Sequence, residues 1–208
     1  PPSMDYGFKD LKDPNAYNPE RAKQLLAEDG WKDTDGDGIL DKDGKPLTFN
    51  FVVYNSRAEL PLYAEAVQAD LKKVGIDMKI KTVDYNLIDK MGQEGDYDML
   101  ISNIVTANTG DPIWFLANYW HTNNNGSNPQ NGSGYSNPQV DQLLDAAETE
   151  FDPAKRRDYA IQIQQLLMND GAALFLGYPK TNIVTGSYLK GAVMYPSDYY
   201  WITNKITK

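Results

Sequence analysis

The stretch from Tyr135 to Leu167, YSNPQVDQLLDAAETEFDPAKRRDYAIQIQQLL, predicts two consecutive helices. The first starts at Ser136 or Asn137, has a proline just inside its first turn, and carries apolar residues at helical spacing. The second has Asp152 as a suitable N-cap and Pro153 as its first helical residue. Apolar residues recur on one face of each helix; they are Val140, Leu143, Leu144 and Ala147, then Tyr159, Ile163, Leu166 and Leu167.

The segment before this helix pair alternates strand and helix patterns. Thr48–Tyr54 (TFNFVVY) and Ile76–Val83 (IDMKIKTV) are β-rich and alternating, which predicts strands. Leu60–Val74 between them predicts an amphipathic helix that Gly75 ends. Strand, helix and strand in close succession predict a βαβ unit with parallel strands. A further buried strand is predicted at Asp98–Val105.

Shorter elements complete the pattern of an α/β layered domain. A helix starts at Pro19 behind the cap Asn18 and ends at Gly30. The segment His121–Gly134 is rich in Asn, Gly and Ser and predicts a mobile surface loop. The other predicted elements are helices at 85–91 and 112–120 and short strands at 172–176, 181–185 and 199–203.

Four stretches in this order resemble one known family. They are YNPERAKQLLAEDGWKDTDGDGILDKDGKPL (17–47), YAEAVQADLKKVGI (63–76), TGDPIWFLANYW (109–120) and the helix pair itself. The order closely resembles the C-terminal lobe of the family 5 extracellular solute-binding proteins, receptors that deliver peptides, nickel or nickel chelates to bacterial ABC importers. The resemblance covers nearly the whole chain and implies a type II periplasmic-binding-protein fold, an α/β lobe with a mixed sheet flanked by helices.

The resemblance also implies how the chain is organised and where it works. Residues 1–208 would form a single domain, the C-terminal lobe of a larger two-lobed receptor, with residues 1–17 as the connection between lobes. Its partners would be the missing N-terminal lobe of the same receptor, the subunits of an ABC permease, and a peptide or other small solute. The location would be extracellular or periplasmic, and the full-length form a membrane-anchored lipoprotein.

Composition narrows the classes of function. The 208 residues are enough for one sizeable core, and 41% of them are hydrophobic. A net charge of −9 without a basic patch argues against nucleic acid and against an anionic membrane surface. The chain has no cysteine, so disulfides and thiolate metal sites are excluded.

Asn108 is the first candidate for contact with the solute. It follows a predicted strand and precedes a predicted helix, and ligands of α/β domains bind at the carboxyl ends of strands. In peptide-binding members of the resembled family, an aspartate at this position holds the ammonium group of the peptide. Asn108 brings no charge, so its bond to an ammonium group would be weaker. Asp111, three residues later, has the simpler interpretation of a helix cap.

Aromatic residues and the single histidine are further candidates. Trp114 and Trp120 are equally compatible with a solute-binding wall and with a hydrophobic core. His121 would complete a nickel ion already held by a small chelator, or it is an ordinary loop residue. Tyr200 lies in the triplet 199–201, of which only some rings can face a cleft because strand side chains alternate.

The segment from Asp33 to Asp41 reads DTDGDGILD and resembles the start of a calcium-binding loop. Asp33, Asp35, Asp37 and Asp41 would supply side-chain oxygens to a structural calcium ion. The pattern departs from an EF-hand because Gly44 stands where a bidentate glutamate is needed. An acidic, solvated hairpin loop is the alternative interpretation.

No recognisable enzyme motif is present. The sequence has no glycine-rich phosphate loop, no nucleophile elbow and no zinc-ligand cluster. We therefore expect a receptor that is not an enzyme and requires no cofactor, with nickel entering only as part of a solute. The alternatives are a carbohydrate-active hydrolase using two carboxylates and a calcium-dependent binding module.

Overall fold

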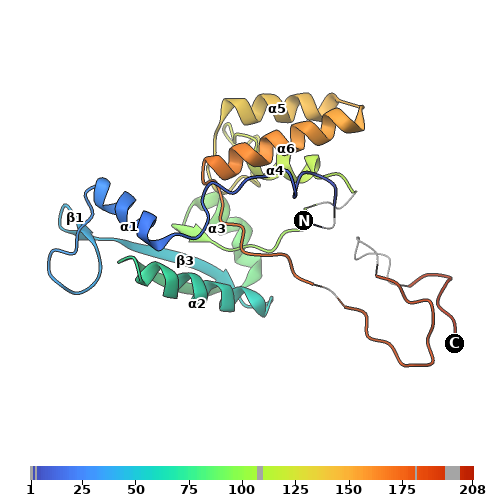
Figure 1. Cartoon of the computed structure of the whole chain (residues 1–208), viewed down its shortest axis with the longest axis horizontal. Helices are drawn as coiled ribbons and strands as arrows, with labels where there is room; N and C mark the ends of the chain where they lie inside the picture. The colour runs from blue at the N-terminus through green and yellow to red at the C-terminus, as the bar shows by residue number, and fades with distance from the viewer. Residues whose placement is uncertain (1, 3, 107–109, 181, 195–201) are drawn as a thin grey trace.

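The computed structural model describes residues 2, 4–106, 110–180, 182–194 and 202–208 (Figure 1). We distinguish a sheet half (residues 18–106), a helical half (residues 110–171) and a C-terminal arm (residues 172–208). No helix in the described ranges is long and apolar enough to cross a lipid bilayer.

Three strands form the sheet, in the order β4-β3-β5. β3 (Thr48–Tyr54) pairs with β4 (Asp77–Val83) along its whole length, and both neighbours of β3 run parallel to it. α2 (Glu59–Lys72) connects β3 to β4 and packs against both strands. The predicted βαβ unit is therefore confirmed. The described strands of this sheet are all parallel, so the sheet is not mixed within these residues.

The middle strand carries the core of the sheet half. Val52 and Val53 are completely buried, and Tyr54 is 1% exposed. Successive strand residues point to opposite faces, so their burial means that both faces of β3 are covered. α2 contributes Leu60 and Ala64 to this core, and the short helix α3 (Ile88–Glu94) contributes its own apolar side chains.

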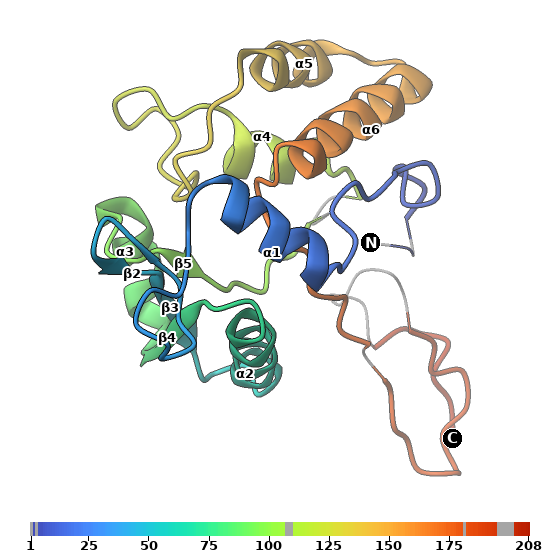
Figure 2. The same ribbon diagram turned by 60° about the vertical axis from the view of Figure 1, so that its left-hand side comes forward.

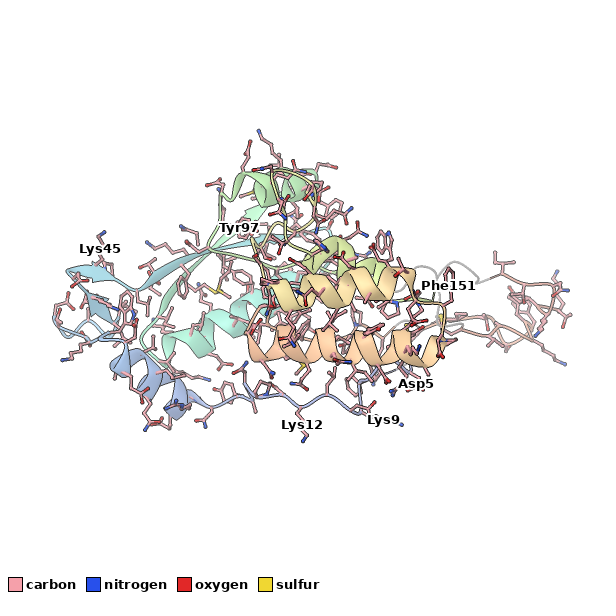
Figure 3. All side chains as sticks on the ribbon, turned by 90° about the horizontal axis from the view of Figure 1, so that it is seen from above. Asp5, Lys9, Lys12, Lys45, Tyr97 and Phe151 are labelled. Atoms are coloured by element: carbon pink, nitrogen blue, oxygen red, sulfur yellow. The ribbon has the colours of Figure 1, made fainter. Side chains whose placement is uncertain are left out.

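The helical half packs α4 (Ile113–Trp120), α5 (Pro138–Thr149) and α6 (Pro153–Asn169) around a second core. Asn137 and Asp152 cap α5 and α6 through their side-chain oxygens, as the sequence predicts. Figure 3 shows the turn between α5 and α6 at Phe151, with Asp5 beside the same end of α6. Five side chains of this core are completely buried: Val140, Leu144, Ala147, Ala160 and Ile163.

The N-terminal segment runs along α6. The Arg157 guanidinium forms ion pairs with Asp5 at 3.2 Å and Asp10 at 2.6 Å. The segment then enters α1 (Pro19–Glu28), which Asn18 caps. α1, together with the small hairpin of β1 (Asp41–Lys42) and β2 (Lys45–Pro46), encloses a third cluster around Leu47, Val74 and Ile76.

Two glycines mark the contact between the sheet half and the helical half. A Cβ on Gly132 would lie 3.1 Å from the Cα of Gly92 in α3, so position 132 leaves little room for a side chain, whereas a Cβ on Gly92 would make only an ordinary contact at 3.9 Å. The hydroxyl of Tyr97 donates a hydrogen bond to the Gly132 carbonyl at the same place. The loop before α5 is thereby fastened to the sheet half.

The C-terminal arm starts against both halves, since Ala172 and Ala173 pack on the helical core and Leu176 packs on the sheet core, and its later described part extends away from them (Figures 1 and 2). A bridge between Lys190 and Thr207 closes it into a loop through two backbone hydrogen bonds. Many of its apolar side chains are exposed to solvent: Leu174, Phe175, Val184, Tyr188 and Ile202. Exposed apolar side chains in this number are unusual on the surface of a monomeric protein and are typical of an interface.

Some predicted elements differ from the observed ones. The strand predicted at Asp98–Val105 is observed only as the short β5 (Met99–Leu100). The backbone N–H of Asn103 donates to the Tyr54 hydroxyl at 3.0 Å instead of to a β3 carbonyl, which ends the pairing. The predictions of strands at 172–176 and 181–185 are wrong for the described residues, which form no ladder there. Residues 199–201 of the last predicted strand lie outside the described residues, and 202 and 203 are not in a strand.

Two glycines with the same backbone conformation provide a test of the packing. Gly75 and Gly36 both have φ of +84°, but a Cβ on Gly75 would lie 2.6 Å from Leu40 Cγ, whereas one on Gly36 meets nothing within 4 Å. Gly36→Ala should cost about 1 kcal/mol of unfolding free energy from backbone strain. Gly75→Ala should cost about 3 kcal/mol, because overpacking adds to that strain. Equal costs in urea unfolding would contradict this packing.

Candidate functional site

The carboxyl ends of three parallel strands meet at one edge of the sheet half. The segments that follow them are residues 55–57 after β3, residues 84–87 after β4 and residues 101–106 after β5. Loops at this edge are the usual ligand site of α/β domains, since they diverge there and leave a crevice. We call these three segments the strand-end edge.

A hydrogen-bonded network crosses the strand-end edge. Asn103 donates its side-chain amide to the Glu59 carboxylate at 3.1 Å, and its backbone N–H to the Tyr54 hydroxyl at 3.0 Å. Glu59 is the first residue of α2, so the network joins β3, α2 and the segment after β5. Tyr54 is buried and cannot move freely, which fixes the position of Asn103 and therefore the orientation of Glu59.

Apolar side chains lie uncovered around this network. Tyr85 is 57% exposed and packs edge-to-face on Tyr54, with ring centroids 5.1 Å apart. Leu87 and Val105, on the two neighbouring segments, are also about half exposed. A polar network surrounded by apolar and aromatic side chains is the usual composition of a small-molecule site.

The structure separates the two tryptophans that the sequence leaves equivalent. Trp114 is 46% exposed, early in α4, whereas Trp120 is 8% exposed and belongs to the core of the helical half. Trp120 packs edge-to-face on Tyr135, and its indole N–H has no hydrogen-bond partner among the described residues. Trp114 therefore keeps its role as a candidate contact residue, while Trp120 is placed as a core residue.

Asn108 and Tyr200 lie outside the described residues, so their predicted contacts with a solute stay predictions. Asp111, just after Asn108, accepts the Ile113 backbone N–H at 2.9 Å, as expected for a residue that starts α4. Its other oxygen pairs with Arg156. Arg156 also donates to the carbonyls of Ala147 and Glu150 and so ties the beginnings of α4 and α6 to the end of α5.

His121 is held by α5 rather than free in a loop. Its Nε2 lies 3.3 Å from the Asp145 carboxylate, and its Nδ1 lies 3.3 Å from the Thr122 carbonyl. Partial burial lowers the pKa of His121, but the Thr122 carbonyl, Asp141 and Asp145 outweigh it, so the net pKa is raised. Both carboxylates favour a protonated ring, which competes with binding of a metal ion.

The loop from His121 to Gly134 is more ordered than its composition suggests. The side-chain amide of Asn128 donates to the His121 carbonyl at 2.7 Å, and that of Asn131 donates to the same carbonyl at 3.0 Å. Asn131 is 4% exposed and also donates to the Tyr135 carbonyl. These two asparagines satisfy carbonyls at the end of α4, which explains why asparagine suits positions 128 and 131.

The acidic loop gathers three of the four predicted carboxylates. One oxygen each from Asp33, Asp35 and Asp37 lies within 4.8 Å of the others, and all three residues are exposed. Asp33 already accepts the backbone N–H groups of Gly36 at 2.7 Å and Gly38 at 3.0 Å. Asp41 is not in this group and instead accepts from Thr34. The hydrogen bonds that these carboxylates accept from the loop backbone explain why they lie close together. Calcium binding stays a prediction.

Glu59, Asn103 and Tyr85 were not recognised as site candidates from the sequence. Tyr85 follows the strand predicted at 76–83, and Glu59 lies between the strand predicted at 48–54 and the helix predicted after it, so the strand-end rule points to both. Asn103 lies inside the strand predicted at 98–105, so that rule gives no signal for it. The pairing of Asn103 with Glu59 spans 44 positions, and no local pattern reveals it.

Comparison with known proteins places the chain among solute receptors. Residues 1–127 match the family model described as "Bacterial extracellular solute-binding proteins, family 5 Middle". The oligopeptide-binding protein AppA of Bacillus subtilis is 32% identical over 196 residues, which cover 90% of this chain and 34% of AppA. The probable D,D-dipeptide-binding periplasmic protein DdpA of Escherichia coli is 32% identical over 73% of this chain and 29% of DdpA. The chain thus spans about a third of the length of these relatives.

Solved structures give the same result. AppA in complex with a nonapeptide aligns with a TM-score of 0.68 at 31% identity, over 79% of this chain and 32% of that chain. NikA from Staphylococcus aureus, in complex with Ni(L-His)2, aligns with a TM-score of 0.64 at 27% identity, over 78% and 32%. The predicted periplasmic-binding-protein fold is therefore confirmed.

The surroundings of His121 predict a pH dependence of stability. Its raised pKa means that the folded state binds the proton more tightly than the unfolded state. The resulting stabilisation is fully present below pH ~6.5 and is lost as pH rises through the raised pKa; for a partly exposed pair it amounts to about 0.5 kcal/mol. His121→Gln should remove this dependence in urea unfolding between pH 5 and 8 (about the range in which histidine titrates). A wild-type stability that grows through this range relative to His121→Gln would contradict the assigned ion pair.

Proposed function

Since the chain belongs to the bacterial extracellular solute-binding proteins of family 5, we propose that it forms one lobe of the substrate-binding component of an ABC importer. In this proposal the solute binds at the strand-end edge and a second lobe covers it. The observation that carries the proposal is the uncovered edge itself, where Tyr85 is 57% exposed beside a half-buried polar network. A closed cleft would remove these side chains from water.

Proteins of this family are transport receptors and not enzymes. The hydrolase alternative is therefore set aside on family membership. Family members act in the periplasm or outside the cell. For this protein we propose the same location, and anchoring by a lipid in the full-length form.

The C-terminal arm supports a second lobe as the partner. Val184 is 92% exposed and Ile202 is 89% exposed, and both line an apolar hollow within the arm. Side chains of this kind stabilise a fold only when they are buried, each by about 1.5–3 kcal/mol. We propose that the missing lobe of the same receptor covers the arm, and that permease subunits bind the assembled receptor.

A short peptide is the solute that the similarities favour. AppA and DdpA, both 32% identical, are named for binding peptides, and AppA has been crystallised with a nonapeptide. A nickel complex is the second candidate, because NikA of Staphylococcus aureus is 25% identical over 95% of the chain. His121 would be its ligand in that case, but Asp145 already holds that ring.

Calorimetry tests this proposal with two probes, a nonapeptide with a free amino terminus and a nickel–histidine complex. The complete receptor should bind the peptide, and the isolated 208-residue chain should bind it at least ~10-fold more weakly, because half of a cleft lacks enclosure. Equal affinity of the isolated chain and the complete receptor would contradict the two-lobed site. Binding of the nickel complex alone would replace the peptide by the second candidate.

A further inference from the structure

The Glu59 carboxylate has one oxygen committed and one available. Oε1 accepts the Asn103 side-chain amide at 3.1 Å, while Oε2 has no donor among the described residues. No lysine or arginine in the described ranges forms an ion pair with it, and Arg57, two residues earlier, is exposed and forms no ion pair with any described residue. Glu59 is also only half-buried, so its free oxygen can meet a group from solution.

A favourable helix position explains why an acid is tolerated here, but not how it is oriented. Glu59 stands in the first turn of α2, where a negative charge is stabilised by the helix dipole. That effect needs no side-chain partner. The bond to Asn103, which the buried Tyr54 hydroxyl positions in turn, fixes the carboxylate against the ends of β3 and β5.

The surroundings of this carboxylate suit a cationic nitrogen. Tyr85 packs on the ring of Tyr54, which itself bonds the residue that holds Glu59. Its exposed ring offers an aromatic surface at the same edge. A carboxylate forms a charge-assisted hydrogen bond with an ammonium group. An uncharged donor would form a weaker bond, and an anionic group would be repelled by the carboxylate.

We propose that Glu59, oriented by Asn103, is the anionic contact that selects solutes carrying an ammonium group, such as the free amino terminus of a peptide. This rests on the proposed function, since it requires the solute to lie at the strand-end edge. Asn103 is a positioning residue in this proposal, and Glu59 is the residue that touches the solute.

The test compares a nonapeptide that has a free amino terminus with the same peptide N-acetylated, by calorimetry on the complete receptor. Wild-type protein should prefer the free amine by at least ~10-fold. Glu59→Gln should reduce that preference to near unity with little change for the acetylated peptide, whereas Glu59→Asp should keep most of it. Glu65→Gln, an exposed acid on the same helix that forms no ion pair among the described residues, is the matched control and should keep the full preference.

The outcomes separate this inference from the proposed function. If wild-type receptor binds both peptides equally, or if Glu59→Gln keeps the full preference, Glu59 does not select the ammonium group, although the receptor still binds peptides. If wild-type receptor binds neither peptide, the peptide as solute is overturned and this inference with it. Thermal unfolding of each variant checks that Glu59→Gln remains folded, and Glu59→Asp provides the same comparison if it does not.

Discussion

Parallel pairing of β3 with both neighbours is the constraint on which the rest of the sheet half depends. Because β4 and β5 run in the same direction as β3, all three carboxyl ends fall on one edge. A parallel connection needs a crossover element, and α2 supplies it on the way to β4. The crossover starts at Glu59, so the connection that builds the sheet also places a carboxylate at the edge.

The helical half has a different construction, in which capped helices pack around a buried apolar core. Arg156 and Asp111 tie the three helices together where the chain enters α4. The halves meet at Gly92 and Gly132, where the backbone of α3 leaves little room for a Cβ on Gly132. Such a contact relies on backbone shape alone, and Tyr97 adds one directional bond to it. These contacts set the position of α4 and of the exposed Trp114 relative to the sheet.

Local patterns predicted the elements whose cause is local. Asn137 and Asp152 mark helix starts because a cap acts within three residues, and the period of TFNFVVY marks β3. Predictions failed where the cause was distant in the sequence. β5 is short because the backbone N–H of Asn103 donates to the Tyr54 hydroxyl on β3. His121 likewise depends on Asp145, 24 positions away on α5. The strands predicted in the arm need pairing partners, and none lies in the described part of the chain.

Hydrogen–deuterium exchange on the complete receptor tests the central claim, that the solute binds at the strand-end edge. With the free-amine nonapeptide bound, exchange should slow at residues 84–87 and 101–106, which follow β4 and β5. The turn between α5 and α6, where Phe151 is 93% exposed, should be unaffected and serves as the internal reference. Slowing confined to the helical half, with no change at the strand ends, would contradict the account.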